Sequence, residues 1–149
     1  MDKIIIADTS CLIALDNIGH LYILKDLFSE VNITEQVSQE FGNPLPDWFV
    51  IHRVIISPAV ENMLDAGEAS AITLALTYDN PLLIIDEKRG RKIAETLHIP
   101  IIGTLKLLLL AKQHTVINEI RPIINLLDAN GFRFSKLIVT ELLALAGEA

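Results

Sequence analysis

Short apolar runs alternate with longer segments of helical periodicity along most of this chain. The runs at residues 3–7, 31–33, 82–85 and 99–102 are dominated by Ile, Leu and Val, which is typical of strands covered on both faces in a parallel sheet. Apolar residues three and four positions apart predict helices between these runs, at residues 10–16, 20–28, 34–41, 66–78, 88–97 and 104–113.

Two regions are less regular. Residues 42–58 open with turn residues and close with a β-branched run at 50–56, and the stretch from about residue 118 onward favours two helices around a turn at Asn130 and Gly131. No repeat, low-complexity tract or linker divides the chain. Alternation of this kind predicts one domain over residues 1–149, a three-layer α/β/α sandwich around a mainly parallel sheet.

The composition indicates an aliphatic core and no membrane span. Of the 149 residues, 51% are hydrophobic but only 5% aromatic. The densest apolar stretch, residues 101–111, is interrupted by Lys106 and falls short of the roughly 20 residues that a spanning helix needs. Asp8 lies where the apolar part of a secretory signal would continue. Because Cys11 is the only cysteine, we expect no internal disulfide and a reduced, cytoplasmic setting.

The net charge of −7 is the wrong sign for a protein that holds nucleic acid by bulk electrostatics. Any nucleic-acid role would need a local basic patch or bound cations. Residues 88–92 provide one patch, with four cations in five positions. This run has two interpretations, a solvated helix face or a phosphate contact.

Two acids directly follow predicted strands. Asp8 closes the first strand, and Asp86 closes the strand at residues 82–85. Ligands of open α/β sheets bind outside the carboxyl ends of the strands, so these carboxylates would lie close together if their strands are neighbours. Asp also caps the helix that follows a strand, so capping and function are equally open for either residue alone.

Two glutamates on predicted helices add to this set. Glu40 shares a helix face with Val37 and Phe41, and a carboxylate on an apolar face is costly unless it has a partner. Glu68 lies in the first turn of its helix. Its spacing from Asp65 is that of a capping box, which explains Glu68 equally well when that residue is considered alone.

Four carboxylates in one cleft would raise one another's pKa values and destabilise the fold. A hard divalent cation removes this difficulty, because Mg²⁺ and Mn²⁺ prefer oxygen ligands and are held by a few carboxylates with water and substrate phosphate. Such an ion activates water and stabilises charge on a phosphodiester. Asp8, Glu40, Glu68 and Asp86 together therefore suggest a Mg²⁺ or Mn²⁺ site that acts on a phosphate ester.

The order of these acids, with hydroxyl residues after Asp8, resembles that of PIN-domain ribonucleases. It is most similar to small bacterial and archaeal PIN proteins that are themselves similar to VapC-type toxins. The resemblance covers nearly the whole chain and rests on the segments ADTSCLIAL, ITEQVSQEF, LDAGEASAITLAL, LLIIDEKRGRKIAE and IPIIGTLKLLLLAK. It implies a parallel-sheet PIN fold, often dimeric, with a Mg²⁺ or Mn²⁺ site made by the four acids.

The resemblance also implies roles for neighbouring residues. In this family the hydroxyl residue two after the first Asp, here Ser10, often supports the site. Thr9 is a second candidate, and we also treat it as a possible substrate contact. Arg89 and Arg91 are the candidates for phosphate contacts.

One position departs from the family pattern. Many PIN domains carry a further acid a few residues beyond the strand-borne Asp, but the position four after Asp86 is Gly90. Only the adjacent Glu87 could substitute. The number of metal ions is therefore left open.

The expected activity is metal-dependent hydrolysis of RNA phosphodiester bonds. Asp8, Glu68 and Asp86 would be direct or water-mediated ligands, Glu40 would complete the site, and Ser10 would orient a carboxylate. The expected partners are an RNA substrate, a second copy in a homodimer and, if the protein is the toxin of a type II toxin–antitoxin pair, an antitoxin that covers the cleft. The alternative is a non-catalytic PIN-like module that binds RNA or protein.

Two other enzyme classes also gather aspartates at strand ends. Phosphotransfer receivers place an acidic pair at the first strand, where this chain has Asp8 alone. Phosphatases with an aspartyl nucleophile place a second Asp two residues after the first, where this chain has Ser10. The histidines are scattered, so we expect surface or packing roles for them rather than metal binding: His20, His52, His98 and His114.

Overall fold

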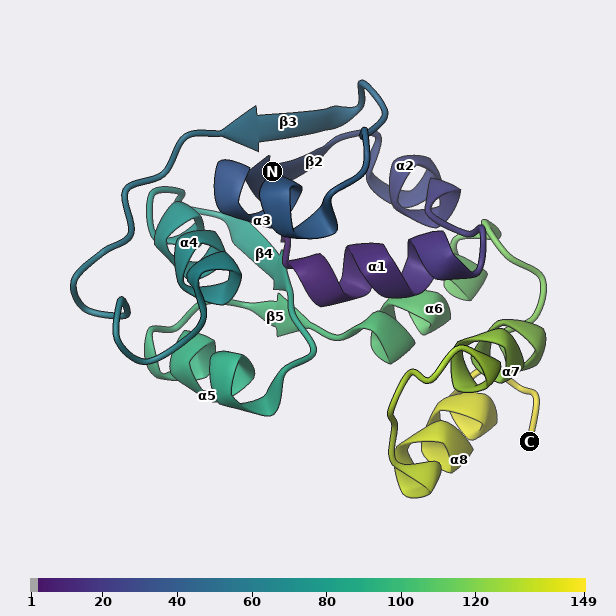
Figure 1. Cartoon of the computed structure of the whole chain (residues 1–149). Helices are drawn as coiled ribbons and strands as arrows, with labels where there is room; N and C mark the ends of the chain where they lie inside the picture. The colour runs from purple at the N-terminus through teal and green to yellow at the C-terminus, as the bar shows by residue number, and fades with distance from the viewer. Residues whose placement is uncertain (1–2) are drawn as a thin grey trace.

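The computed structural model describes residues 3–149 and contains a five-stranded parallel sheet in the order β3-β2-β1-β4-β5 (Figure 1). The strands are β1 (Ile4–Ala7), β2 (Val31–Thr34), β3 (Phe49–His52), β4 (Pro81–Ile84) and β5 (Ile101–Ile102). The helices are α1 (Thr9–Asn17), α2 (Tyr22–Phe28), α3 (Glu35–Phe41), α4 (Ala66–Ala75), α5 (Lys88–Thr96), α6 (Thr104–Gln113), α7 (Arg121–Ala129) and α8 (Lys136–Leu145).

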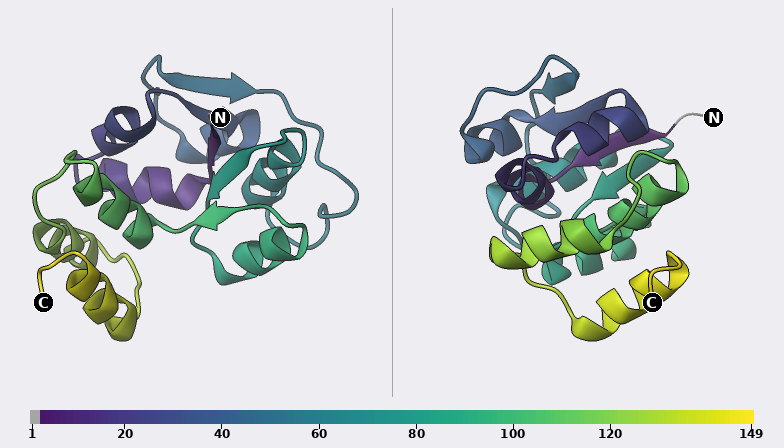
Figure 2. Two further views of the ribbon diagram at one scale, coloured as in Figure 1. Left: turned by 180° about the vertical axis from the view of Figure 1, so that it is seen from behind. Right: turned by 90° about the vertical axis from the view of Figure 1, so that its right-hand side faces the viewer.

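The predicted three-layer α/β/α sandwich around a parallel sheet is confirmed. Alternate strand residues face opposite helical layers, as the two-residue period of a strand requires. Ile5 and Ala7 pack with α1, α2 and α6, whereas Ile6 packs with α4 and α5 on the other face. Helix α3 contacts both α1 and α4, and Figure 2 shows the two layers from behind and from the side.

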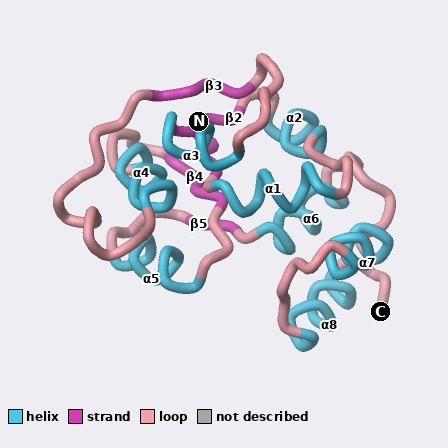
Figure 3. Tube along the Cα trace, in the orientation of Figure 1, coloured by secondary structure: helices cyan, strands magenta, loops and turns pink. Residues whose placement is uncertain are grey.

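The irregular region at residues 42–58 contains the edge strand β3, which is shorter than the β-branched run suggested. Only Phe49–His52 pairs with β2, in register over four residues. The remainder of the run lies in the loop that leads to α4 (Figure 3). Pro81 starts β4, a position where the missing N–H of proline is tolerated.

The last two helices form a second core on the outer side of α6. Leucine and isoleucine side chains of α6, α7 and α8 pack together there, with Phe132 and Phe134 at the margin. The Glu148 carboxylate accepts hydrogen bonds from the N–H of Ile120 at 2.8 Å and from Lys112 Nζ at 2.9 Å. Burial raises the pKa of Glu148, but these donors outweigh it and lower that pKa to about 2. The segment after α8 is thereby fixed to the start of α7.

The strand registers bring several chain segments to one edge of the sheet. Ala7 pairs with Ile84, and Ile84 pairs with Ile102. The residues that follow β1, β4 and β5 therefore meet at the same edge. Within residues 3–149, none of the helices combines the length and the apolar character needed to cross a bilayer.

Candidate active site

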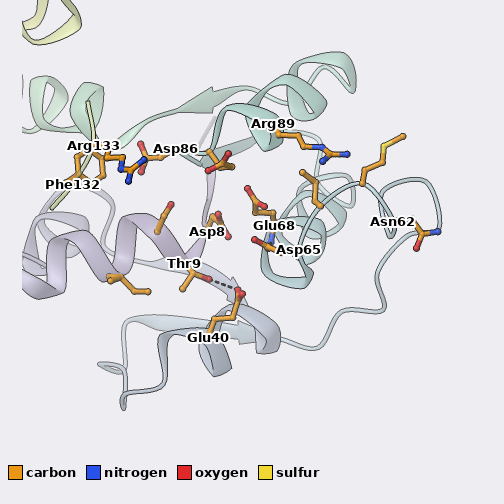
Figure 4. Close-up of a pocket in the computed structure, with 15 residues that line it drawn as sticks. Asp8, Thr9, Glu40, Asn62, Asp65, Glu68, Asp86, Arg89, Phe132 and Arg133 are labelled. Carbon is orange, nitrogen blue, oxygen red and sulfur yellow. Dashed lines mark hydrogen bonds between the residues drawn. The ribbon is translucent and has the colours of Figure 1, made fainter. Parts of the chain in front are cut away.

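An open cleft of about 970 Å³ lies at this edge of the sheet. All four acids singled out in the sequence line it, and Figure 4 shows their side chains arranged around one space. Among residues 3–149, six acids line the cleft: Asp8, Glu40, Asp65, Glu68, Asp86 and Glu87. The sheet topology therefore assembles carboxylates from four separate parts of the chain.

Asp8 follows β1 and is only 4% exposed. It occupies the cap position of α1, but its side chain makes no capping hydrogen bond within the described chain. Burial raises the pKa of the Asp8 carboxyl to about 7; the Thr9 N–H opposes this, and the charges of Asp65 and Glu40 add to it. Capping therefore does not account for Asp8, because burial of its carboxyl is costly and no capping hydrogen bond offsets that cost.

Glu68 lies in the first turn of α4 and is 6% exposed. Asp65 caps this helix by accepting the N–H of Glu68 at 2.9 Å, so half of the predicted capping box forms. Oε2 of Glu68 is buried, with no hydrogen-bond partner among residues 3–149. Burial, contact with the Asp65 carboxyl and the charges of Asp65 and Asp8 raise the pKa of Glu68 to about 8. Capping thus explains Asp65 but leaves the Glu68 carboxyl unexplained.

Glu40 is held at the cleft by a neighbour from α1. Thr9 Oγ1 donates a 2.8 Å hydrogen bond to Oε1 of Glu40. A Cβ atom at Gly67 would lie 1.7 Å from the same Oε1 atom. Glycine at the start of α4 therefore makes room for the Glu40 carboxylate.

A buried hydroxyl network joins α3 to α4 beneath these acids. Ser70 Oγ donates to the carbonyl of Gly67 at 2.8 Å, so Thr34 Oγ1, 2.7 Å from Ser70 Oγ, is the donor in that contact. Thr34 also caps α3 with its side chain. The network fixes the helix that carries Glu40 against the helix that carries Glu68.

Asp86 lies two residues beyond β4, beside the first residue of α6. Thr104 donates its backbone N–H to Oδ1 at 2.8 Å and its hydroxyl to Oδ2 at 2.5 Å. Thr104 is fully buried, and the N-terminal end of a helix favours negative charge. Cys11 is also fully buried next to Thr104, and burial raises the pKa of its thiol above the usual range. Asp86 is therefore a rigidly held carboxylate, backed by buried residues and open to the cleft on its other side.

The donor set suits a hydrated divalent ion. No three ligating side chains within residues 3–149 converge closely enough to form a direct metal cage. Mg²⁺ commonly keeps several waters and takes only one or two protein carboxylates directly. The unpartnered Oε2 of Glu68 and the raised pKa of Asp8 both mark a place where a cation would offset charge. The residues fit an ion bound partly through water.

Gly90 explains the departure from the usual acid pattern. A Cβ atom there would lie 2.7 Å from Cδ1 of Ile85 and 2.9 Å from Oε2 of Glu68. An acid at this position would displace the Glu68 carboxylate. Glu87 does line the cleft, from the cap position of α5.

The remaining predicted site residues divide between two cavities. Thr9, Ser10 and Arg89 line the acidic cleft, whereas Arg91 lines a smaller adjacent cavity. Ser10 Oγ is buried and has no hydrogen-bond partner among the described residues. The bond that orients a carboxylate, expected from Ser10, comes instead from Thr9 to Glu40.

Several residues of the site were not singled out in the sequence. The sequence pattern predicts Asp65 only as a helix cap and residue 104 only as the start of a helix. Phe132 and Arg133 line the cleft from the loop between α7 and α8. The spacing of Asp65 and Glu68 was a usable signal for the first, but nothing local to residues 132–133 indicates which part of the fold they reach.

The family of this chain follows from its similarity to known proteins. A family model described as a PIN domain matches residues 4–148. No curated protein and no solved structure matched the chain. PIN domains are generally nucleases that use divalent metal ions. Because the match extends over nearly the whole sequence, the chain belongs to the PIN-domain family.

Proposed function

We propose that this protein is a metal-dependent endoribonuclease that hydrolyses RNA phosphodiester bonds with the help of Mg²⁺ or Mn²⁺. The observation that carries the proposal is the buried, unpartnered Oε2 of Glu68 in a cleft with five other acids. A chain that only bound RNA would gain nothing from this arrangement, because clustered carboxylates repel phosphate. A divalent ion reverses that repulsion.

Three acids are the proposed ligands, direct or through water: Asp8, Glu68 and Asp86. Glu40 completes the site, oriented by its hydrogen bond from Thr9. The bound ion would lower the pKa of a coordinated water and offset negative charge on the phosphodiester. Asp8 and Glu68 must lose their protons for the ion to bind, and their raised pKa values place that loss near neutral pH.

The other groups act on the site or on the substrate. Thr104 holds Asp86 so that its carboxylate cannot rotate away. Arg89 lies at the wall of the cleft, where Figure 4 shows it beside the acids. A guanidinium there supplies positive charge to a substrate phosphate. Such a local cation is needed because the net charge of the chain is −7.

The test combines metal binding with cleavage. Calorimetric titration with Mn²⁺ should show binding by the unaltered chain and by Glu119→Gln, an exposed acid outside the cleft, but weak or no binding by Glu68→Gln. The unaltered chain should cleave single-stranded RNA in Mn²⁺, and Asp8→Asn should not. RNA binding without cleavage by the unaltered chain would instead favour the non-catalytic module.

The finer assignment is a cytoplasmic toxin of the VapC type, working as a homodimer and covered by an antitoxin. Its support is the resemblance to small PIN proteins, together with an acidic cleft that suits a basic side chain of an antitoxin peptide. Expression of the unaltered chain should then arrest bacterial growth, whereas Asp8→Asn should not. Normal growth with abundant, folded and RNA-cleaving protein would remove the toxin assignment and leave the nuclease.

A further inference from the structure

A second cavity, of about 300 Å³, adjoins the acidic cleft between β5, the start of α6 and the α7–α8 loop. We call it the basic annex. It shares Asp86, Phe132 and Arg133 with the cleft, so the two spaces are continuous at the strand-borne acid. In Figure 4, Arg133 and Phe132 lie on the side of Asp86 opposite Arg89.

The annex combines positive charge with apolar walls. Three cations line it, Arg91, Lys106 and Arg133, and none of them makes an ion pair or a side-chain hydrogen bond with any residue from 3 to 149. Within the described part of the chain, Asp86 is the one acid that lines the annex, and Thr104 already binds both of its oxygens. Three unpaired cations beside one satisfied carboxylate form a site for an anion.

Arg91 lies in the annex close to Asp86, one of the residues that the two spaces share. A Cβ atom on Gly103 would lie 3.1 Å from Oδ1 of Asp86 and 3.7 Å from Nη1 of Arg91. The guanidinium therefore reaches the same glycine that the carboxylate approaches. A phosphate held by Arg91 would lie next to the acids of the cleft.

The aromatic wall of the annex is held rigidly. Phe132 N–H donates to the carbonyl of Leu127 at 2.9 Å, and Gly131 N–H donates to that of Asp128 at 3.0 Å. This is the Schellman pattern, and Gly131 takes the required left-handed conformation with φ of 84°. Phe132 and Phe134 also pack against the core of α6, α7 and α8. The backbone that carries Phe132 is thus fixed, and both rings are backed by this core.

We propose that the basic annex is a nucleotide subsite. A base packs against Phe132 and Phe134, and its phosphate is bound by Arg91, Lys106 and Arg133. This inference rests on the proposed function and adds to it a place in the fold for one unpaired nucleotide of the RNA. Aromatic rings stack only on unpaired bases, and cations on both sides of the acids fit an extended polyanion rather than one nucleotide. The strand would run from Arg89 past the carboxylates into the annex.

The test uses a fluorescently labelled single-stranded oligoribonucleotide, its fully paired duplex, and Asp8→Asn protein in Mg²⁺ so that nothing is cut. In this background, Arg133→Gln and Arg91→Gln should each weaken single-strand binding by about five-fold or more. Each should also reduce the slope of log affinity against log salt concentration by about 0.7, the value for one lost phosphate contact. The duplex should bind far more weakly than the single strand.

Matched controls separate the annex from general positive charge. Lys92→Gln and Lys136→Gln remove exposed cations that lie close in sequence to Arg91 and Arg133 and line neither cavity. Both should bind RNA within about two-fold of the parent. Phe134→Leu should weaken single-strand binding and leave the salt slope unchanged, because stacking releases no counterion. Melting temperatures verify that each variant is folded.

The outcomes also separate this inference from the nuclease proposal. Suppose that Arg133→Gln has the same RNA affinity and salt slope as Lys136→Gln, while the protein that retains Asp8 cuts RNA. The annex proposal is then wrong and the nuclease proposal is supported. Suppose instead that the protein that retains Asp8 never cuts RNA but Arg133→Gln still lowers RNA affinity. The nuclease proposal is then wrong, and the annex is supported as an RNA-binding site.

Discussion

Thr104 binds both oxygens of the Asp86 carboxylate, one through its backbone N–H and the other through its hydroxyl. Ile84 of β4 pairs with Ile102 of β5, and Asp86 and Thr104 each follow two positions after these residues. The strand register therefore places Asp86 beside Thr104. The position of the acid, just beyond the end of β4, therefore depends on the pairing of β4 with β5.

Replacing Thr104 with Val keeps the side-chain shape and the backbone donor but removes the hydroxyl. We expect a loss of about 1–3 kcal/mol in the free energy of unfolding, because a partly buried, charged oxygen of Asp86 loses its hydroxyl donor. Mn²⁺ affinity should fall with it, since Asp86 is freed to rotate. Urea unfolding and calorimetry measure the two effects, and Thr140→Val on the exposed face of α8 is the control. Unchanged Mn²⁺ affinity would remove Asp86 from the ligand set.

Gly67→Ala tests whether the glycine exists to accommodate Glu40. The backbone there is ordinary helix, so alanine should favour α4 by up to about 1 kcal/mol. Its Cβ would, however, displace the exposed end of Glu40 and break the bond from Thr9. We expect equal or higher stability together with weaker Mn²⁺ binding and slower RNA cleavage.

A double-mutant cycle isolates this effect. Once Glu40 is replaced by Ala, adding Gly67→Ala should cost no further Mn²⁺ affinity, because the displaced group is already absent. Additive losses would show that alanine at position 67 damages the site by another route.

Stability in the absence of metal should fall as the pH rises from about 4 to about 8. The unfolded chain releases the protons of Asp8 and Glu68 near pH 4, whereas the folded chain retains them to about pH 7 and 8. The folded state thus binds more protons in this window, and its stability decreases with pH. Urea unfolding in EDTA should show this slope, flattened in Asp8→Asn and Glu68→Gln but not in Glu119→Gln.

Added Mn²⁺ should have the opposite effect in the same window. An ion that binds the ionised acids of the folded state stabilises it most at the top of the range, where those acids have lost their protons. If Mn²⁺ stabilised the protein equally at both ends of the window, these two carboxyls would not be its ligands.

The stability that Glu148 contributes should change with pH in the opposite direction. Its pKa is lowered from 4.5 to about 2, so the stability it contributes is present above pH 4.5 and is lost as the pH falls toward 2. Glu148→Gln should cost about 1–3 kcal/mol at neutral pH and expose α7 and α8 to protease. Glu141→Gln, an exposed acid of α8, is the control. Limited proteolysis followed by mass determination locates the loosened segment.

The central sheet was predictable because of how its strands are covered. Parallel strands buried on both faces appear in a sequence as apolar runs, and residues 4–7 and 81–84 show this plainly. Since ligands collect at the carboxyl ends of such strands, the positions of Asp8 and Asp86 predicted that they lie at one edge of the sheet, but left open whether each is a helix cap or a ligand. The edge strand β3 was less clear, because its β-branched run continues into a loop.

The walls of the site were less predictable, because they depend on tertiary packing. Arg133 reaches the cleft only because α7 and α8 dock on the outer side of α6. Gly67 is informative only when the position of Glu40, 27 residues earlier in the sequence, is known. The sequence pattern also left open whether Asp65 and Glu68 formed a cap or a site, and the structure assigns the capping to Asp65.

Chemical labelling of the buried Cys11 thiol can report when the core around it opens. It is the only cysteine in the chain, it is fully buried, and it lies beside Thr104 under the charges of Asp86 and Asp8. Because Cys11 is fully buried, a thiol reagent can reach it only when the core around it opens. The rate of labelling therefore measures how often this core opens, without an engineered probe, and an ion held by the acids of the cleft should lower that rate.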